Sequence, residues 1–468
     1  MRNKKANLYS AIRFATIAAA AAPASVLAGG FSLNEQSASA MGVANAGTAA
    51  NPENATTVFF NPAGMSQLSG TNMSFGAAVL DIDAELKEGT GSAVRDDGRP
   101  VTGGNGGDIA DPAVLPNFYM THEVNNWLDV GFGLHAPYGL AADYEDDFKG
   151  RFFADETELT AIAFSPSIAV NDGNGLSLGA GINIIYAEGK LTKFQDYSGT
   201  EARFGLPPGT LDDGYADVEG DDVALTFAFG MLWELSERTQ FGISAQTGAE
   251  LDLDGEAEIR DFPQGSLGSG GLTFSQSTVT EKATVPLEIP ESITFGARHR
   301  ITDTVTFLAG ATWAKWSRFE ALDIVSREDN GPVSSRAGPG LGDDRLIAHV
   351  SENWKDTWQA NVGAIWQATP EWAFKAGYAW DESPVNDDFR TARIPSGDRD
   401  WLTLGAQYAD ARSGWTVDVA AGVLLFDDQD VDERNYDVND EPMPGAARYQ
   451  GTYELDAWSA GVQVSKSF

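Results

Sequence analysis

The chain has 468 residues, with 31 Lys or Arg against 68 Asp or Glu, and its formal net charge is −37. This acidic balance argues against nucleic-acid binding, which needs a basic surface. The absence of cysteine excludes a disulfide framework and thiolate metal sites. The four histidines form no H-x-x-H pair, so a zinc hydrolase has no recognisable ligand set, and we expect neither a metal nor a cofactor. No run after the N-terminus is long and apolar enough for a transmembrane helix.

The first 28 residues have the pattern of a signal peptide. Arg2, Lys4 and Lys5 give a basic start, and the mostly apolar run 11–22 follows it. The small residues before Gly29 predict cleavage after Ala28. A soluble amphipathic helix is the alternative interpretation. An exported protein could end in the periplasm or in the outer membrane. The rest of the sequence must distinguish these two locations.

Residues 29–70 lack strand alternation and are rich in Ala, Gly, Ser and Asn. A disordered periplasmic tail is one interpretation of this composition. A tail would not need large apolar side chains, however, and this segment includes Phe31, Leu33, Met41, Val58, Phe59, Phe60 and Met65. Because such side chains favour burial, we predict that residues 29–70 form a plug, or hatch, inside a barrel built from residues 71–468.

The remaining chain alternates in the manner of membrane strands. In the segment 372–380, every second residue is apolar and the residues between are small or charged. Segments 401–408, 415–425 and 458–468 repeat this pattern, which gives each strand one apolar face. Aromatic residues stand at the ends of these apolar faces, as in the girdles of a lipid-facing barrel wall.

Connection lengths predict the number of strands. Short polar turns lie near residues 125, 172–174, 236–238, 302–303, 369–371 and 410–412. Long polar stretches lie between them, at about 88–112, 137–157, 195–221, 257–275, 327–353, 384–399 and 428–451. Seven long loops and six short turns require fourteen strands, and bacterial outer-membrane barrels have even strand numbers. We therefore predict an all-β fold, a fourteen-stranded antiparallel transmembrane β-barrel, with a periplasmic all-β protein as the alternative.

The segment 427–441 is the most acidic part of the chain, with eight Asp or Glu against Arg434. Carboxylates suit a Ca²⁺ ion, but their spacing lacks the twelve-residue calcium-loop signature. We therefore interpret this segment as a solvated outer loop.

Several motifs resemble the FadL family of outer-membrane transporters for long-chain fatty acids and aromatic hydrocarbons. They are the start GGFSLNEQSASAMG, the run Phe60-Asn61-Pro62-Ala63, the stretch Pro137-Tyr138-Gly139-Leu140-Ala141, the segment Trp316-Ser317-Arg318-Phe319, WDESPV at 380–385 and RIPSGDRDWLTLGAQY at 393–408. They follow one order through the whole mature chain. The resemblance implies that residues 29–70 are the hatch of a fourteen-stranded barrel.

The resemblance also implies where a ligand binds. A hydrophobic compound would first meet the loop that carries Phe148, Phe152 and Phe153, and would then pass to a deeper apolar pocket. Lys193 aligns with one of the basic residues that line this pocket in the family. A second family lysine is replaced here by Val350, with His349 beside it. This departure leaves room for a less polar substrate, and a solvated loop lysine is the alternative interpretation of Lys193.

In the family, the ligand leaves sideways at a kink in the third strand. Pro137 cannot donate to a strand ladder and Gly139 adopts unusual backbone angles readily, so we expect pairing to fail at Pro137, Tyr138 and Gly139. Asp129, Gly131, Gly133 and His135 are expected to face inward. The hatch, through Phe31 and the turn Asn61-Pro62-Ala63, is expected to satisfy the unpaired strand and to move when ligand binds.

These features predict a monomeric outer-membrane protein, surrounded by lipid, for the passive uptake of hydrophobic small molecules. Long-chain fatty acids are the favoured substrates, and aromatic hydrocarbons or alkanes are the alternative within the family. A general porin and a surface adhesin remain competing interpretations. An enzyme is disfavoured, because no Ser/His or Asp/His set is recognisable.

Overall fold

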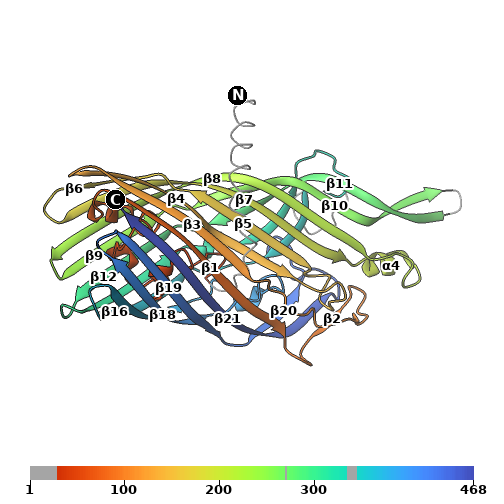
Figure 1. Ribbon diagram of the computed structural model, residues 1–468. Helices are drawn as coiled ribbons and strands as arrows, with labels where there is room; N and C mark the ends of the chain where they lie inside the picture. Colours follow the sequence, from red (N-terminus) through yellow and green to blue (C-terminus); the bar gives the residue numbers. More distant parts are fainter. Residues whose placement is uncertain (1–28, 269–270, 335–344) are drawn as a thin grey trace.

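A computed structural model describes residues 29–268, 271–334 and 345–468 (Figure 1). The predicted signal peptide, residues 1–28, lies outside the described residues. None of the described helices has the length and apolar character needed to cross a membrane.

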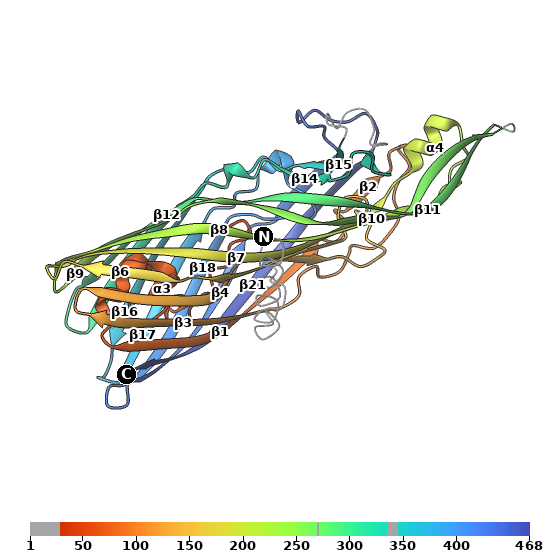
Figure 2. The ribbon, with the colours of Figure 1, turned by 90° about the horizontal axis from the view of Figure 1, so that it is seen from above.

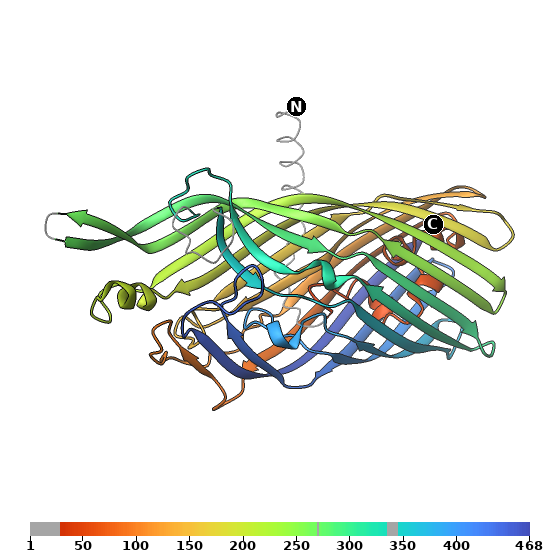
Figure 3. The ribbon, with the colours of Figure 1, turned by 180° about the vertical axis from the view of Figure 1, so that it is seen from behind.

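The described residues form one closed antiparallel barrel of fourteen wall strands (Figures 1 and 3). In chain order the strands are β1 (Thr71–Leu86), β3 (Ala113–Asn125), β4 (Leu128–Asp143), β5 with β6 (Glu156–Phe164, Ser167–Asn171), β7 (Leu176–Gln195), β8 (Gly214–Ser236), β9 with β10 (Thr239–Gln246, Ala249–Gly268), β11 with β12 (Gly271–Ile289, Ser292–Arg300), β13 with β14 (Val305–Ala314, Ala321–Ser326), β15 with β16 (Leu346–Ser351, Thr357–Gln367), β17 (Trp372–Asp381), β18 (Arg399–Asp410), β19 with β20 (Trp415–Phe426, Gln429–Arg434) and β21 (Arg448–Ser467). β21 pairs with β1 and closes the ring. The short β2 (Ser92–Val94) pairs with β21 above the wall. The predicted barrel and its strand number are confirmed.

The predicted alternation is also confirmed. On β17, Trp372, Phe374 and Tyr378 are at least 40% exposed, whereas Ala373 and Lys375 are almost fully buried. The exposed side chains face away from the lumen, and their exposure is favourable only in contact with lipid. The wall is therefore apolar outside, as a barrel in a membrane requires.

Three of the predicted outer loops differ from expectation. The stretch 257–275 is mostly strand. β10 pairs with β11 from Ala249 opposite Ile289 to Gly268 opposite Gly271, and the two form a hairpin that projects beyond the barrel (Figure 2). Part of 428–451 is also strand, since β20 pairs with β21. The stretch 384–399 is largely buried and contributes to the lumen instead of forming a solvated loop. Strands outside the membrane need no apolar face, so the polar sequences of the first two stretches resemble those of loops.

The hatch lies inside the barrel (Figures 1 and 2). Its elements are α2 (Ala38–Met41), η1 (Thr48–Ala50), α3 (Thr57–Phe60) and η2 (Pro62–Gln67). The helices contact wall strands on several sides of the lumen, including β7, β9, β12 and β19. Of the large apolar side chains expected to be buried, Phe31, Leu33, Met41, Val58 and Met65 are at most 4% exposed, and Phe59 and Phe60 are partly buried.

Inward-facing glycines of the wall form the seat of the hatch. A Cβ on Gly242 would overlap the carbonyl oxygen of Ala49, and one on Gly377 would overlap the backbone at Val43. Further wall glycines lie close to the hatch backbone: Gly179, Gly230, Gly296, Gly363 and Gly405. The missing side chains let the backbone of the hatch approach the wall closely. Any other residue type would push the two apart.

A buried ion pair also joins hatch and wall. The ammonium of Lys375 on β17 lies 2.6 Å from a carboxylate oxygen of Glu53 in the hatch and 3.2 Å from one of Asp418 on β19. Lys375 and Asp418 have side chains only 1% exposed. Burial without a partner would be strongly unfavourable for each charge, so the pair fixes the hatch at this position.

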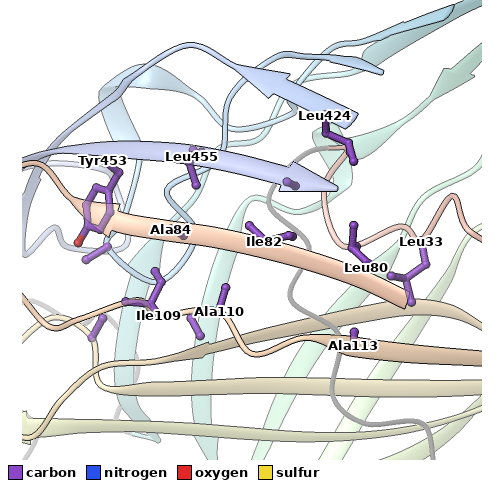
Figure 4. Close-up of a cluster of buried hydrophobic side chains, with 14 of the residues drawn as sticks. Leu33, Leu80, Ile82, Ala84, Ile109, Ala110, Ala113, Leu424, Tyr453 and Leu455 are labelled. Carbon is purple, nitrogen blue, oxygen red and sulfur yellow. The ribbon is translucent and has the colours of Figure 1, made fainter. Parts of the chain in front are cut away.

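Two apolar clusters fill the outer half of the lumen. One lies along β1, β19 and β21 and includes Leu80, Ile82 and Leu455, which face Ile109 of the first outer loop and Leu33 of the hatch (Figure 4). The other surrounds Phe31 on the side of β5, β7, β10 and β11. The first cluster borders an outer cavity through Phe152 and Phe153, and the second surrounds a cavity deeper in the lumen.

Candidate functional site

An apolar cavity lies above Phe31. Its lining is mainly aliphatic and comes from seven wall strands and the segment before β18: Leu140, Leu159, Leu191, Val218, Leu253, Val285, Leu287, Leu322 and Ile394. Alternation places these residues on the inner faces of strands whose outer faces meet lipid. A lining of this kind suits the apolar part of a small molecule.

Phe31 forms the floor of this cavity and is itself enclosed by aromatic rings. Its ring centroid lies 4.6 Å from that of Trp316, 5.8 Å from that of Trp354 and 5.9 Å from that of Tyr138. Trp316 begins the short helix η3 (Trp316–Arg318), and Phe319 completes the enclosure at 6.2 Å. Edge-to-face packing of this kind stabilises the closed position of the hatch beyond the area it buries.

Two cations stand at the outer side of the cavity. Arg393, from the segment between β17 and β18, is 5% exposed and lines the apolar cavity. Its guanidinium donates to the carbonyl oxygens of Glu156 and Thr192, at 3.2 and 2.7 Å, and to the hydroxyl of Thr157, at 2.8 Å. Lys193, near the end of β7, lines a second cavity of about 1280 Å³ that Arg393 also borders. The two cavities therefore share Arg393, and Lys193 lines the second of them.

Buried carboxyl groups lie in the same region. Burial raises the pKa of Glu433 to about 7, against the opposing effects of a backbone hydrogen bond and the charges of Arg393 and Lys193. Burial likewise raises the pKa of Glu352 to about 8. Burial and the charge of Arg393 lower the pKa of Lys193 to about 8, although Glu433 opposes that shift. The carboxyl of Glu352 accepts a hydrogen bond from the indole N–H of Trp354 at 2.9 Å, which connects the charged region to the aromatic enclosure of Phe31.

The loop after β4 contributes its three phenylalanines unequally. Phe152 and Phe153 line an outer cavity of about 1150 Å³, which also reaches Lys193. The guanidinium of Arg95 lies 4.8 Å from the centre of the Phe152 ring. Phe148 is fully buried and stacks on Tyr144 at a centroid distance of 4.0 Å. Phe148 thus stabilises the loop through its packing. Of the three phenylalanines, only Phe152 and Phe153 border a space that a ligand could occupy.

His349 lines the second cavity together with Lys193, but its ring nitrogens are already engaged. Nδ1 lies 2.6 Å from a carboxylate oxygen of Asp323, and Nε2 lies 3.0 Å from the hydroxyl of Ser351. His349 is therefore positioned by two neighbours. Of the basic residues at this site, Lys193 has no hydrogen bond or ion pair within the described part of the chain.

The pairing of β4 is interrupted where the sequence predicted it. The β4–β5 register shifts between His135 and Tyr138, and the β3–β4 ladder ends at the pair Phe118–Leu134. The hatch binds the released strand: the N–H of Leu33 donates to the carbonyl of Pro137 at 3.0 Å, and the N–H of Gly139 donates to that of Phe31 at 2.9 Å. Tyr138 and Gly139 still pair with β5, so pairing of this stretch is lost only on the side of β3, where the hatch takes its place. A role of this stretch in ligand exit stays a prediction.

The inward and outward faces of β4 also agree with expectation. Asp129 and His135 are 3% exposed, and Gly131 lies against Met65 of the hatch, whereas Val130 is 38% exposed on the outside.

The turn at Asn61 is fixed to the wall. The side chain of Asn61 accepts a hydrogen bond from the N–H of Ala63 at 3.0 Å and donates to the carbonyls of Ala49 and Met231. Pro62 and Ala63 lie directly against Gly179. A gating role for this turn stays a prediction, and its contacts are those of an anchor.

Sequence reasoning overlooked Arg393, Glu433 and the enclosure formed by Trp316 and Trp354. Arg393 begins the motif RIPSGDRDWLTLGAQY, and Trp316 lies in another motif that was recognised, yet neither was assigned a contact. Glu433 lies in the acidic run that was interpreted as solvated. No signal in the sequence distinguishes this buried carboxyl from its exposed neighbours.

A family model described as outer membrane protein transport protein (OMPP1/FadL/TodX) matches residues 18–468. The chain belongs to this family. Its members are outer-membrane transport channels and not enzymes, as the sequence led us to expect. This membership also agrees with the outer-membrane location expected from the strand pattern.

Similar proteins match along almost their full length. A putative outer membrane protein of Neisseria meningitidis is 29% identical over 464 residues, covering 96% of both chains. The long-chain fatty acid transport protein of Escherichia coli K12 is 26% identical, covering 94% of both chains. Among solved structures, a Pseudomonas aeruginosa FadL homologue has a TM-score of 0.79 at 21% identity, covering 94% of this chain and 100% of the other. The Pseudomonas putida toluene transporter TodX has a TM-score of 0.65 at 17% identity, covering 94% and 99%.

Proposed function

We propose that this FadL-family protein takes up long-chain amphiphiles with an anionic head, foremost fatty acids, by passive diffusion across the outer membrane. The observation that carries the proposal is the apolar cavity that shares Arg393 with a neighbouring cavity lined by Lys193. An aliphatic tail would fill the cavity above Phe31, and a carboxylate would accept charge-assisted hydrogen bonds from these two cations. Several relatives named for long-chain fatty acid transport support this substrate class.

The path begins at the outer cavity. Phe152 and Phe153 offer apolar contact to a compound arriving from outside, and Lys193 borders both this cavity and the next. A ligand can therefore pass inward while its head stays near the same positive charge. Each stage offers apolar contact to the tail, so diffusion down a gradient needs no energy source.

Release requires movement of the leading segment of the hatch. Phe31 and Leu33 are paired with β4 at the kink, on the side where the β3–β4 ladder has ended. Withdrawal of these residues would open the floor of the apolar cavity toward the gap between β3 and β4. Lipid lies outside that gap, so an apolar compound could leave sideways into the membrane without crossing water.

A specific observation favours a second candidate, the uptake of aromatic hydrocarbons. Apart from its cationic rim, the cavity above Phe31 is almost wholly apolar, and aromatic rings enclose its floor. Toluene transporters are among the proteins of similar fold. An uncharged ring would need no contact with Lys193 or Arg393, so the two candidates differ in their dependence on these charges.

Binding to the purified barrel in non-ionic detergent separates the candidates. Quenching of Trp316 and Trp354 fluorescence would be measured with palmitate and with toluene. We expect palmitate to bind and Lys193→Glu to weaken its binding roughly tenfold to a hundredfold, the usual effect of a lost charge-assisted hydrogen bond. Lys149→Glu, in a nearby outer loop, is the matched control and should change little. Binding of toluene without palmitate would establish the hydrocarbon alternative.

A general porin is tested separately by liposome swelling. We expect sucrose to enter liposomes containing the intact protein no faster than control liposomes, because the hatch is seated against the wall on several sides. Rapid sucrose influx would overturn the proposed function.

A further inference from the structure

Glu433 lies at the centre of the charged region between the cavities. Groups that carry or can carry charge surround it: Lys193 on β7, Asp388, Arg390 and Arg393 before β18, Tyr144 after β4, Tyr449 on β21, His349 and Glu352 from β15 and the residues after it, and Arg434 and Tyr436 at and after the end of β20. Its side chain is held in this position because β20 pairs with β21 and turns Glu433 inward.

The position of the Glu433 carboxylate is fixed by one strong contact. It accepts a hydrogen bond from the backbone N–H of Ala392 at 2.8 Å, directly beside Arg393. The residue is only 9% exposed. Its neighbour Asp432 points outward and pairs with Arg448 at the surface, so the two carboxylates of the same strand have different environments.

The charges of Asp155 and Glu352 also act on Arg393, but neither carboxylate forms a hydrogen bond with its guanidinium among the described residues. The hydrogen bonds of Arg393 go to neutral oxygens of Glu156, Thr157 and Thr192. Lys193 has no hydrogen-bonded partner within the described residues. Glu433 is the carboxylate whose charge acts on both cations. Glu433 lines one cavity together with Lys193 and accepts its hydrogen bond from the residue next to Arg393, so its carboxylate lies where the head of an anionic ligand would have to approach.

We propose that Glu433 is the internal counter-ion of this site, so that an anionic ligand binds with uptake of one proton from solution while an uncharged ligand binds without it. This inference rests on the proposed function. The ligand anion replaces the negative charge of Glu433, and the proton converts that carboxylate to a neutral carboxylic acid. The net charge around Lys193 and Arg393 then stays constant, which avoids two buried anions side by side.

The direction of the pH effect follows from this exchange. Below the pKa of Glu433, which burial raises to about 7, the carboxyl is already neutral and the cations attract an anion fully. As the pH rises through that value, the carboxylate competes with the ligand and anion affinity falls. If the anion binds only the protonated form, affinity falls about fourfold between pH 6 and pH 7.5. An uncharged ligand gains nothing from the proton, and its affinity stays constant.

The experiment uses a ligand whose own charge does not change with pH. Dodecane-1-sulfonate remains an anion over this range, and 1-dodecanol is an uncharged ligand of the same length. Both are titrated against the full barrel carrying Lys193→Arg, since an arginine keeps its charge where a lysine of lowered pKa would not. We expect sulfonate affinity to fall about fourfold between pH 6 and pH 7.5 and dodecanol affinity to stay level.

Glu433→Gln in the same background should remove the pH dependence and hold sulfonate affinity at its low-pH value. Asp432→Asn is the matched control, and His349→Gln removes the imidazole that lines the cavity; both should retain the fourfold fall. Unchanged dodecanol binding shows that each variant is folded. A pH dependence that survives Glu433→Gln overturns the counter-ion role but leaves the proposed function standing. Failure of the unmodified protein to bind either sulfonate or palmitate overturns both.

Discussion

Covalent closure of the hatch segment should abolish transport. Ser32 and Tyr138 face each other across the bridge that joins the hatch to β4, and backbone hydrogen bonds flank the pair on both sides. Opposed residues of this kind have Cα atoms about 4.5 Å apart, within the range of a disulfide. Because the natural chain has no cysteine, Ser32→Cys with Tyr138→Cys would introduce a single bridge.

The contacts at this segment give the size of the closure energy. Two backbone hydrogen bonds and the bond from Gln36 to the carbonyl of Ala136 contribute together about 2–4 kcal/mol. Burial of the Phe31 side chain adds about 1.5–3 kcal/mol. A total of about 4–7 kcal/mol corresponds to an open fraction of roughly one in a thousand to one in a hundred thousand. Ligand binding can overcome a closure of this size, whereas a disulfide prevents opening altogether.

The assay is uptake of labelled palmitate by cells that express the double variant. Uptake is expected to fall to background when the bridge forms and to recover after a reductant is added. The single variants Ser32→Cys and Tyr138→Cys control for the lost tyrosine. A bridge elsewhere in the hatch, from Ala38→Cys and Gly461→Cys, has facing Cβ positions about 3.3 Å apart and should leave uptake intact. Full uptake by the oxidised Ser32–Tyr138 variant would refute the role of this segment.

Two further changes test the hatch seat and the outer loop. Gly242→Ala should lower the thermal unfolding temperature, because the new methyl group overlaps Ala49. Gly265→Ala is the control and should not lower it, since the atom nearest to a Cβ at that position is 3.4 Å away. Equal unfolding temperatures for the two variants would contradict the close contact between hatch and wall. Phe148→Ala should destabilise the outer loops by about 3–5 kcal/mol, measured by calorimetry, while palmitate binding at low temperature changes little. A large loss of binding without loss of stability would instead place Phe148 in contact with ligand.

The barrel was predictable because its signals are local. Alternation on segments such as 372–380 requires only the neighbouring residues, and the short turns restrict where strands can reverse. The errors occur where lipid no longer imposes a pattern. The hairpin of β10 and β11 extends beyond the barrel wall, and the polar sequence of its paired strands resembles that of a loop. The segment 384–399 is polar yet buried, because its arginines and serines find partners inside the lumen.

The site was predictable only in part, for a different reason. Lys193 and Phe31 were identified through the family resemblance, and the kink at Pro137 through the chemistry of proline. The contacts of Arg393 and Glu433 depend on four elements that are far apart in the sequence and meet only in the closed barrel. A buried carboxyl and a solvated one are the same residue type in a linear chain, and only tertiary packing distinguishes Glu433 from Asp432.

The same packing argues for local opening over removal of the whole hatch. Release of Phe31 and its neighbours costs about 4–7 kcal/mol by the contacts above. Removal of the entire hatch would also expose Met41, Val58 and Met65, at about 1.5–3 kcal/mol each. It would separate Glu53 from Lys375 and leave that lysine and Asp418 without their third partner. The leading segment is thus the part of the hatch that a bound ligand can displace, and it lies where the wall is already unpaired.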